Sequence, residues 1–442
     1  MISEKSPVTL QDALPESVEV VVIGGGVIGI ATAWFLAKDG VSVLVCEKGR
    51  VAGEQSSRNW GWIRQQGRDA AELPIVMDSI DIWAGLSAEI GTDVGFTRSG
   101  VLYLAETEKE LAAHERWLSI AEQHQLDTRL LSSTEVDELI SGKPGQFCGG
   151  LYTPSDGRAE PFVAVPALAR AAQQRGCSIR ENCAVRNLDI QAGRVSGVIT
   201  EHGRVRATAV VCAGGAWSSL FAANQGIRLP QLTVRSTVAR TSATAEIFAG
   251  AVAANDIALR RRQDGGYTVA ASGANEHFIG ADSFRYFFEF LPALKSSKVF
   301  LRLRAGDGLI TRMRPRRSWN ADEISPFEET RVLNPAPSPA AVRQMHDRLG
   351  ARFPALKGIK FEEVWAGMID VTPDVVPVMD EVAQCPGLYL ATGFSGHGFG
   401  IGPGAGKIMA EMVQGKPIPH DLGRFAFARF ADGTPMQPGP GL

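Results

Sequence analysis

Short apolar runs alternate with a helical stretch at the start of the chain. Residues 18–23 form one apolar run, residues 41–46 form another, and an amphipathic stretch that ends at Asp39 and Gly40 lies between them. Apolar runs of this length, bounded by turn residues, are typical of buried strands, and the stretch between them has the length of a helix. The pattern therefore predicts a strand, a helix and a second strand.

The same patterns predict elements further along the chain. Apolar residues recur every three or four positions over 69–90, and we also expect helices over 106–123, 160–174 and 338–353. Strands are expected over 101–104, 178–181, 184–188, 195–200, 204–207, 209–212, 232–240, 257–262, 267–271 and 387–391.

The positions of three glycines and one carboxylate indicate what the first strand–helix–strand unit binds. The first strand ends in Gly24-x-Gly26-x-x-Gly29, and Glu47 follows the second strand. Such glycines allow a tight turn, a close approach of backbone N–H groups to a diphosphate, and close packing of helix on strand. A carboxylate at the position of Glu47 accepts hydrogen bonds from ribose hydroxyls and disfavours NADP. The unit therefore predicts a dinucleotide-binding site, and the alternative is a glycine-rich turn in an ordinary α/β protein. The motif alone does not distinguish FAD from NAD as the dinucleotide.

The loop over 51–68 follows the expected ribose position directly. It combines hydroxyls, charged groups and aromatic rings: Ser56, Ser57, Arg58, Asn59, Trp60, Trp62, Arg64 and Arg68. One interpretation is that the loop wraps the diphosphate and continues to the reactive ring of a cofactor. The alternative is a solvated loop in which the tryptophans are packing anchors.

A second glycine-rich segment lies near the end of the chain. The strand over 387–391 runs into a glycine-rich turn over 392–406, and we expect a helix over 407–414. Such a turn supplies backbone N–H groups at a helix N-terminus. A long ligand with two chemical ends, such as FAD, would use both glycine segments, whereas NAD would not need the second.

Composition narrows the class of protein. The chain has 442 residues, 45% apolar and 21% charged, with a net charge of −3, which suits two or three globular domains and gives no reason to expect nucleic acid. Six scattered cysteines without a CxxC pair indicate a reducing compartment. The polar first 17 residues and the absence of an apolar stretch of about 20 residues lead us to expect a cytoplasmic protein. The seven histidines show no HxxxH or HExxH spacing, so we expect no catalytic metal.

One segment leaves two interpretations open. Residues 284–295 are densely aromatic, and basic residues follow: Lys298, Arg302, Arg304, Arg312, Arg314, Arg316 and Arg317. The region 284–304 is either a peripheral membrane patch on the inner face of the membrane or a helix packed on the protein with a solvated basic face.

Several of these motifs together carry a family likeness. G-G-G-V-I-G with Glu47, A-V-V-C-A-G-G-A-W, T-P-D and A-T-G-F-S-G-H-G-F-G resemble the D-amino-acid-oxidase-like flavoproteins, which include glycine oxidase, sarcosine oxidase and amino acid dehydrogenases. V-A-G-E-Q-S-S-R, F-E-F-L-P-A-L, S-P-F-E-E-T-R and W-A-G-M-I-D look like the bacterial membrane-associated L-amino acid deaminases. Those deaminases have an N-terminal membrane anchor and a glutamine near Trp62, and many family members have a carboxylate-binding arginine near Ile369.

The resemblance implies an α/β fold with a Rossmann-like FAD-binding domain and an interleaved α+β substrate domain on an antiparallel sheet. Residues 18–90, 150–228 and 345–430 would form the FAD-binding domain, residues 91–149 and 229–344 the substrate domain, and residues 1–17 a tail. FAD would be bound non-covalently in an elongated form. The expected contacts are Gly24, Gly26, Val27, Ile28, Gly29, Glu47, Lys48, Gln55, Ser56, Ser57, Arg58, Gly61, Val185, Ala213, Gly214, Trp217, Gly367, Asp374, Gly393, Gly396, His397, Gly398, Gly400 and Ile401.

The implied reaction is oxidation of the C–N bond of an amino acid or amine by hydride transfer to flavin N5, followed by hydrolysis of the imine. We expect Asn59, Trp60, Arg64 and His397 at the catalytic end. Arg64 would bind an acidic group of the substrate, its alternative being a surface salt bridge. His397 either donates a hydrogen bond or proton or is only structural. Oxygen, a quinone or an electron-transfer partner would reoxidise the flavin.

Two other functions remain open at this point. The chain could be a flavin-bearing subunit or binding module of a hetero-complex without turnover of its own. A NAD-linked dehydrogenase is the third alternative, and bleaching of the flavin by NADH without an amine would favour it.

Overall fold

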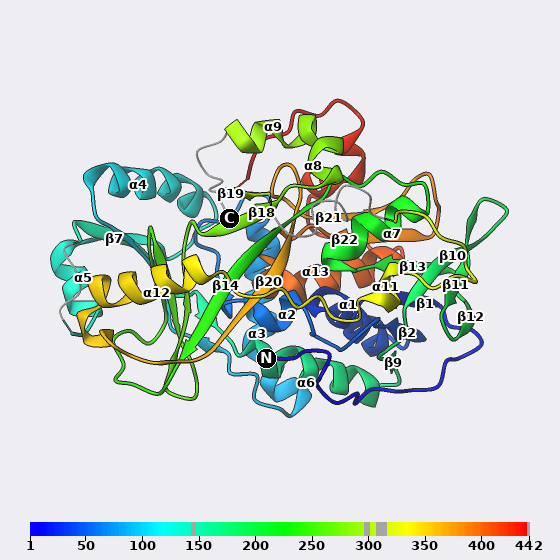
Figure 1. Ribbon diagram of the computed structural model, residues 1–442, viewed down its shortest axis with the longest axis horizontal. Coiled ribbons are helices and arrows are strands. Elements are labelled where there is room, and N and C mark those ends of the chain that lie inside the picture. The colour runs from blue at the N-terminus through cyan, green and yellow to red at the C-terminus, as the bar shows by residue number, and fades with distance from the viewer. Residues whose placement is uncertain (143–146, 296–300, 306–315, 440–442) are drawn as a thin grey trace.

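Two large sheets lie side by side along the long axis of the molecule in the computed structural model (Figure 1). The structure describes residues 1–142, 147–295, 301–305 and 316–439. The fold is mixed α/β, as the sequence predicts.

The first sheet is parallel except at one edge. Its order is β21 (Val378–Glu381), β22 (Leu388–Thr392), β13 (Ala209–Cys212), β1 (Val20–Ile23), β2 (Val43–Cys46) and β9 (Ser178–Arg180), with β21 antiparallel to β22. Alternate residues of β1 and β2 enter two separate apolar cores, which explains why both strands are continuous apolar runs. The strand–helix–strand prediction for the start of the chain is confirmed.

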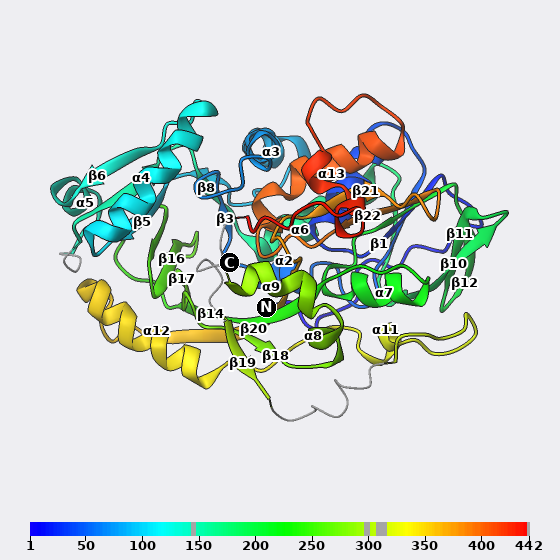
Figure 2. The same ribbon diagram turned by 90° about the horizontal axis from the view of Figure 1, so that it is seen from above.

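Helices and a small sheet cover the two faces. Four helices pack on one face, namely α1 (Val27–Lys38), α3 (Leu73–Ile90), α6 (Pro161–Gln174) and α13 (Gly398–Val413). Figure 2 shows α3 and α13 next to each other on this side. The other face is covered by β10 (Val185–Gln191), β11 (Arg194–Thr200), β12 (Gly203–Arg206) and α7 (Ser218–Asn224).

The second sheet is antiparallel apart from the pairs β5–β15 and β18–β19 among the described strands. Its order is β19 (Leu301–Arg304), β18 (Asn275–Phe278), β14 (Leu232–Thr241), β17 (Tyr267–Ala270), β16 (Ile257–Arg261), β15 (Ala251–Ala254), β5 (Val101–Ala105), β7 (Gly149–Thr153) and β6 (Arg129–Ser132). The helices α4 (Glu108–Gln123), α5 (Ser133–Leu139) and α12 (Pro339–Arg352) lie around it (Figure 1).

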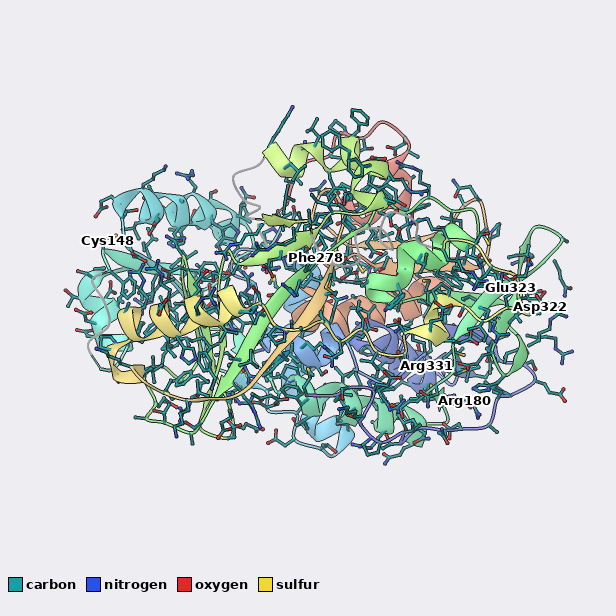
Figure 3. All side chains as sticks on the ribbon, viewed as in Figure 1. Cys148, Arg180, Phe278, Asp322, Glu323 and Arg331 are labelled. Atoms are coloured by element: carbon teal, nitrogen blue, oxygen red, sulfur yellow. The ribbon has the colours of Figure 1, made fainter. Side chains whose placement is uncertain are left out.

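Two segments cross between the halves of the molecule. The long strand β20 (Phe361–Val371) pairs with β14 of the second sheet from Leu232↔Val371 to Thr241↔Phe361, although it lies inside the range 345–430. In the other direction, Trp319 and the Phe327 ring of α11 (Pro326–Glu329) pack into the core below the parallel sheet. Arg331, labelled in Figure 3, pairs there with Glu201 at 2.5 and 2.7 Å. The division of the chain into two domains stays a prediction.

The second glycine-rich segment differs from its prediction. The turn is limited to residues up to His397, and α13 begins at Gly398, so nine residues expected in the turn are helical. Glycine is required at three positions of this helix, because a Cβ atom there would overlap a neighbouring helix. A Cβ on Gly402 would lie 2.7 Å from Val27 Cγ2, and a Cβ on Gly406 would lie 2.4 Å from Ala31 Cβ. A Cβ on Gly404 would lie 2.6 Å from a backbone oxygen of α3. The glycines therefore bring α13 into backbone contact with α1 and α3.

The aromatic segment combines features of both interpretations. It forms α8 (Ala281–Arg285) and α9 (Phe287–Lys295), in which Tyr286 and Phe290 are buried against Val234 and Val371. The rings of Phe284, Phe287 and Phe288 are exposed on the same segment. Lys298, Arg312 and Arg314 of the basic group lie outside the described residues. No helix within the described ranges is long and apolar enough to cross a membrane.

Close packing of α13 leads to a stability prediction. Gly406→Ala should lower the Tm, because the added methyl group overlaps Ala31 and overpacking costs about 1–3 kcal/mol. Gly85→Ala is the matched control, because Gly85 lies inside α3 with open space around its Cβ position, and alanine there should stabilise the helix by about 1 kcal/mol. Thermal unfolding of the two variants should therefore shift in opposite directions. Equal shifts would contradict the proposed packing constraint.

Candidate active site

The turn after β1 is built from backbone contacts. Gly24 has φ +109°, and a Cβ on it would lie 2.5 Å from the carbonyl oxygen of Ala213 at the end of β13. A Cβ on Gly29 would lie 2.0 Å from the carbonyl oxygen of Gly24. Gly26 precedes the first residue of α1 and caps it without a side chain. The glycines of the turn therefore place no side chain of their own in front of the N-terminus of α1.

Two polar side chains meet at this helix N-terminus. Glu47 accepts hydrogen bonds from the backbone N–H groups of Gly25 and Gly49, both at 2.7 Å, and Ser56 Oγ of α2 (Gln55–Arg58) accepts one from Val27 at 2.8 Å. Burial raises the pKa of the Glu47 carboxyl, and Lys48 with the two N–H donors acts in the opposite direction. The carboxylate is thus held in place at the carboxyl end of β2.

A two-chambered cavity runs along the carboxyl ends of the parallel strands. The first chamber extends from Glu47 and Val185, and the second reaches His397 and Arg64; their empty volumes are about 760 and 1560 Å³. Both chambers are lined by Gly26, Gln55, Ser56, Ala213 and Gly215, so they meet at the N-terminus of α1. An elongated cavity with an acceptor carboxylate near one end and backbone donors in the middle fits a dinucleotide such as FAD.

Most residues predicted for the cofactor, and the four predicted for the catalytic end, line this cavity. The first chamber contains Gly24, Gly26, Glu47, Lys48, Gln55, Ser56, Val185, Ala213, Gly214 and Trp217. The second contains Gly26, Val27, Ile28, Gln55, Ser56, Arg58, Asn59, Trp60, Arg64, Ala213, Gly367, Gly396, His397, Gly398, Gly400 and Ile401.

Five predicted residues lie outside both linings, and each has another role. Gly29 and Gly61 have close backbone or side-chain neighbours at their Cβ positions, and the Ser57 side chain is fully buried. Asp374 pairs with Arg429 at 2.8 Å, and the Gly393 N–H donates to Asp370 at 2.7 Å. Gly29 and Ser57 lie within α1 and α2, whereas Gly61, Asp374 and Gly393 lie in loops.

Three polar side chains of the lining are used by the protein itself. Lys48 Nζ donates to Glu54 and to two backbone carbonyls, and the Arg58 guanidinium donates to the carbonyl oxygens of Gly53 and Ala366. The Asn59 side chain donates to Ser56 O and accepts from Gly61 N. The geometry gives these groups a positioning function for the 51–68 loop.

Aromatic rings and an arginine form one wall of the second chamber. Trp60 and Trp62 pack edge to face with ring centroids 5.7 Å apart, and the Arg64 guanidinium lies over the rings of Trp62 and Tyr103 at 5.8 and 5.4 Å. Arg64 Nη1 also donates to the carbonyl oxygen of Gln66 at 2.5 Å. Within the described residues Arg64 has no acidic partner within 4.0 Å, so the surface salt bridge is not what the structure shows.

His397 lies beside an acid that the sequence patterns did not single out. Its Nδ1 is 3.6 Å from Glu72 Oε2, and both side chains are buried. Burial lowers the pKa of His397 to about 3 and raises the pKa of Glu72 to about 8. Both groups are therefore uncharged at neutral pH, and the Glu72 carboxyl retains a proton that it can donate. Glu72 just before α3 resembles any solvated helix start, and only tertiary packing buries it.

Asp370 and Arg68 are two further polar groups of the lining that were not predicted as site residues. Asp370 of β20 accepts from Gly393 N and from Gln231, and thereby joins the glycine turn to the second sheet. Arg68 is buried and lines the second chamber. The W-A-G-M-I-D motif contains Asp370, and the charge of the 51–68 loop includes Arg68, but neither pattern indicates which way the side chain points.

The buried acid gives a pH prediction. In the unfolded chain Glu72 loses its proton near its ordinary pKa of 4.5, whereas the folded protein retains it up to about pH 8, so the wild-type protein loses stability across this interval as the pH rises. Glu72→Gln removes this loss, and its Tm relative to wild type should rise by several degrees between pH 5 and pH 8. Thermal unfolding across this range is the measurement, with the exposed Glu115→Gln as control. A Tm difference that stays constant with pH would contradict a protonated Glu72.

A family model described as DAO, FAD dependent oxidoreductase, matches residues 19–412. The structure of L-amino acid deaminase from Proteus myxofaciens in complex with anthranilate superimposes with a TM-score of 0.92 at 32% identity, over 96% of this chain and 97% of that chain. L-amino acid deaminase from Proteus vulgaris gives 0.90 at 30% identity, over 96% and 100%.

Relatives of lower sequence identity also match over most of this chain. Mitochondrial sarcosine dehydrogenase of Mus musculus is 26% identical over 93% of this chain and 42% of the relative. The chain spans less than half the length of the first curated relatives that it matches.

Proposed function

Because the chain belongs to the DAO family of FAD-dependent oxidoreductases, we propose that it oxidises the C–N bond of an amino acid or related amine. The imine product would be hydrolysed to a carbonyl compound and an amine. The observation that carries the proposal is the pair of adjacent chambers, in which a dinucleotide-type chamber shares lining residues with a chamber that has aromatic walls and an arginine without an acidic partner among the described residues. When bound, FAD supplies the hydride acceptor at flavin N5.

Different groups of the protein would bind different parts of this cofactor. Glu47 would accept from the ribose hydroxyls, and the backbone of Gly24–Gly26 with Ser56 would face the diphosphate. The backbone N–H groups of Gly396, in the turn, and of Gly398, the first residue of α13, would stabilise negative charge at the pyrimidine end of the ring. The parallel sheet with its helices would form the FAD-binding domain, and the second sheet the substrate domain.

Substrate binding rests on the wall that faces the glycine turn. The Arg64 guanidinium offers a planar pair of donors to a substrate carboxylate, and its position over Trp62 and Tyr103 limits its motion. Trp60 and Trp62 would exclude water from the reacting carbon. His397 lines the chamber and is neutral beside protonated Glu72, so its ring can exchange a hydrogen bond with the amine without adding a charge.

Anaerobic flavin reduction tests both the function and the role of Arg64. The purified holoenzyme should bleach on addition of at least one amine or amino acid from a screen of L and D forms. With a carboxylate-bearing substrate, Arg64→Ala should raise KM about tenfold or more at unchanged FAD content, because one charge-assisted contact is lost.

Arg98→Ala, which removes an exposed arginine paired with Asp81, is the matched control and should leave KM unchanged. No bleaching with any amine would favour the alternative of a flavin-bearing subunit without turnover of its own. Bleaching with an unchanged KM in Arg64→Ala would remove only the carboxylate role. The acceptor of the electrons would be oxygen or a quinone-linked partner. Release of hydrogen peroxide would indicate oxygen, and reduction of an artificial dye without peroxide would indicate the quinone-linked partner.

We further propose that the exposed rings of α8 and α9 contact the cytoplasmic face of a membrane. Phe284, Phe287, Phe288 and Leu294 are 63%, 45%, 80% and 47% exposed, and both helices lie at the outer edge of the molecule (Figure 1). Arg285 and Lys295 on the same helices suit anionic headgroups.

Co-sedimentation with anionic phospholipid vesicles should fall several-fold in the double variant Phe287→Ser with Phe288→Ser. Ile190→Ser, which removes an exposed apolar side chain of β10, should have no effect, and equal sedimentation of all three proteins would refute the contact.

A further inference from the structure

The second chamber contains a buried cation that the proposed reaction has not used. Arg68 is only 5% exposed, and its Nε and Nη1 atoms are buried without a hydrogen-bond partner among the described residues. No described carboxylate lies within 4.0 Å of its guanidinium. Burying a charge without a partner is costly, so a guanidinium in this state indicates a site for an anionic ligand group.

A rigid turn presents Arg68 and Arg64 to the same chamber. The Arg68 N–H donates to the carbonyl oxygen of Gln65 at 3.0 Å, and Gly67 has φ +72°, which closes a turn over 65–68. Asp156 holds this turn by accepting from the N–H groups of Gln65 and Gln66 at 2.7 and 3.1 Å. Both guanidinium groups line the second chamber. The backbone positions of the two arginines are therefore fixed relative to each other.

The nearby acids do not neutralise this pair. Burial raises the pKa of Glu72 to about 8 and that of Asp156 to about 7, so Glu72 is mostly neutral at pH 7 and Asp156 is partly neutral. Asp69 lies 3.6 Å from Arg424, and Asp374 pairs with Arg429. This part of the chamber wall therefore keeps an excess of positive charge. Both ring nitrogens of His397, which lines the same chamber, are also buried without a hydrogen-bond partner among the described residues.

We propose that the substrate is an amine with two carboxylates, one bound by Arg64 and the second by Arg68. The two guanidinium groups have no acidic partner among the described residues, so two anionic groups on one substrate would complement them. Each guanidinium can bind one carboxylate through two parallel N–H donors. Monocarboxylic amines would leave Arg68 buried without a partner, so the site discriminates against them. The substrate class rests on the proposed function, whereas the anion site itself does not.

The anion site can be tested without turnover. Isothermal titration of the holoenzyme with succinate, glutarate and adipate should show at least one of them binding about tenfold or more tighter than the monocarboxylate of equal length. Arg68→Gln should abolish this preference and leave monocarboxylate binding unchanged, while Arg68→Lys retains part of it. The Tm of Arg68→Gln without ligand should equal or exceed that of the wild type, because an uncompensated buried charge is removed.

Three results would overturn the proposal. One is that no dicarboxylate binds more tightly than its monocarboxylate. Another is that Arg68→Gln weakens both classes equally, which would mean that the two arginines share one carboxylate. The third is a lowered Tm of Arg68→Gln with the preference intact, which would assign Arg68 a structural role. If dicarboxylates bind as expected but no amine reduces the flavin, the anion site stands and the proposed oxidation fails.

Discussion

The close approach of α13 to α1 is the constraint on which the site depends. Both helices begin at a glycine turn that follows a strand of the parallel sheet, and residues without side chains let them pack in backbone contact. This contact fixes the distance between the turn at Gly24–Gly26 and the turn at Gly393–Gly396. Each turn alone could hold one end of a ligand. Held together, they define one elongated cavity with two chambers.

Charge within the second chamber follows from how the polar groups are buried. Glu72 and His397 are shielded from water by the same packing, and each is uncharged at neutral pH because burial disfavours its ionised form. Arginine does not lose its proton in this way, so Arg64 and Arg68 keep their charge. In the proposed function the chamber would be suited to anionic substrates, and the neutral His397 ring would face the amine. Selection of the substrate would then be separate from the first chamber, which would supply contacts to the cofactor only.

Local sequence patterns predicted the first strand–helix–strand unit, its glycine turn and Glu47, because each of these depends on neighbours within about 30 residues. The same patterns misplaced the start of α13. Glycines over 398–406 indicate a turn when only local preference is considered, whereas they serve helix packing against Val27, Ile75 and Ala31. Glu72 and Asp370 were not predicted as site residues for a related reason. Glu72 lies next to His397, more than 300 residues away in the sequence, and Asp370 accepts a hydrogen bond from Gly393, more than 20 residues away. Arg64 was predicted from its place in the loop, but the aromatic rings that hold it come partly from β5.

The central claim is that both glycine turns hold a single elongated FAD molecule. A crystal structure of the holoenzyme tests it most directly. We expect adenosine in the first chamber with its ribose on Glu47, and the flavin ring in the second chamber beside Gly396–Gly398. A flavin ring located anywhere outside the second chamber, or an adenosine that does not contact Glu47, would contradict it.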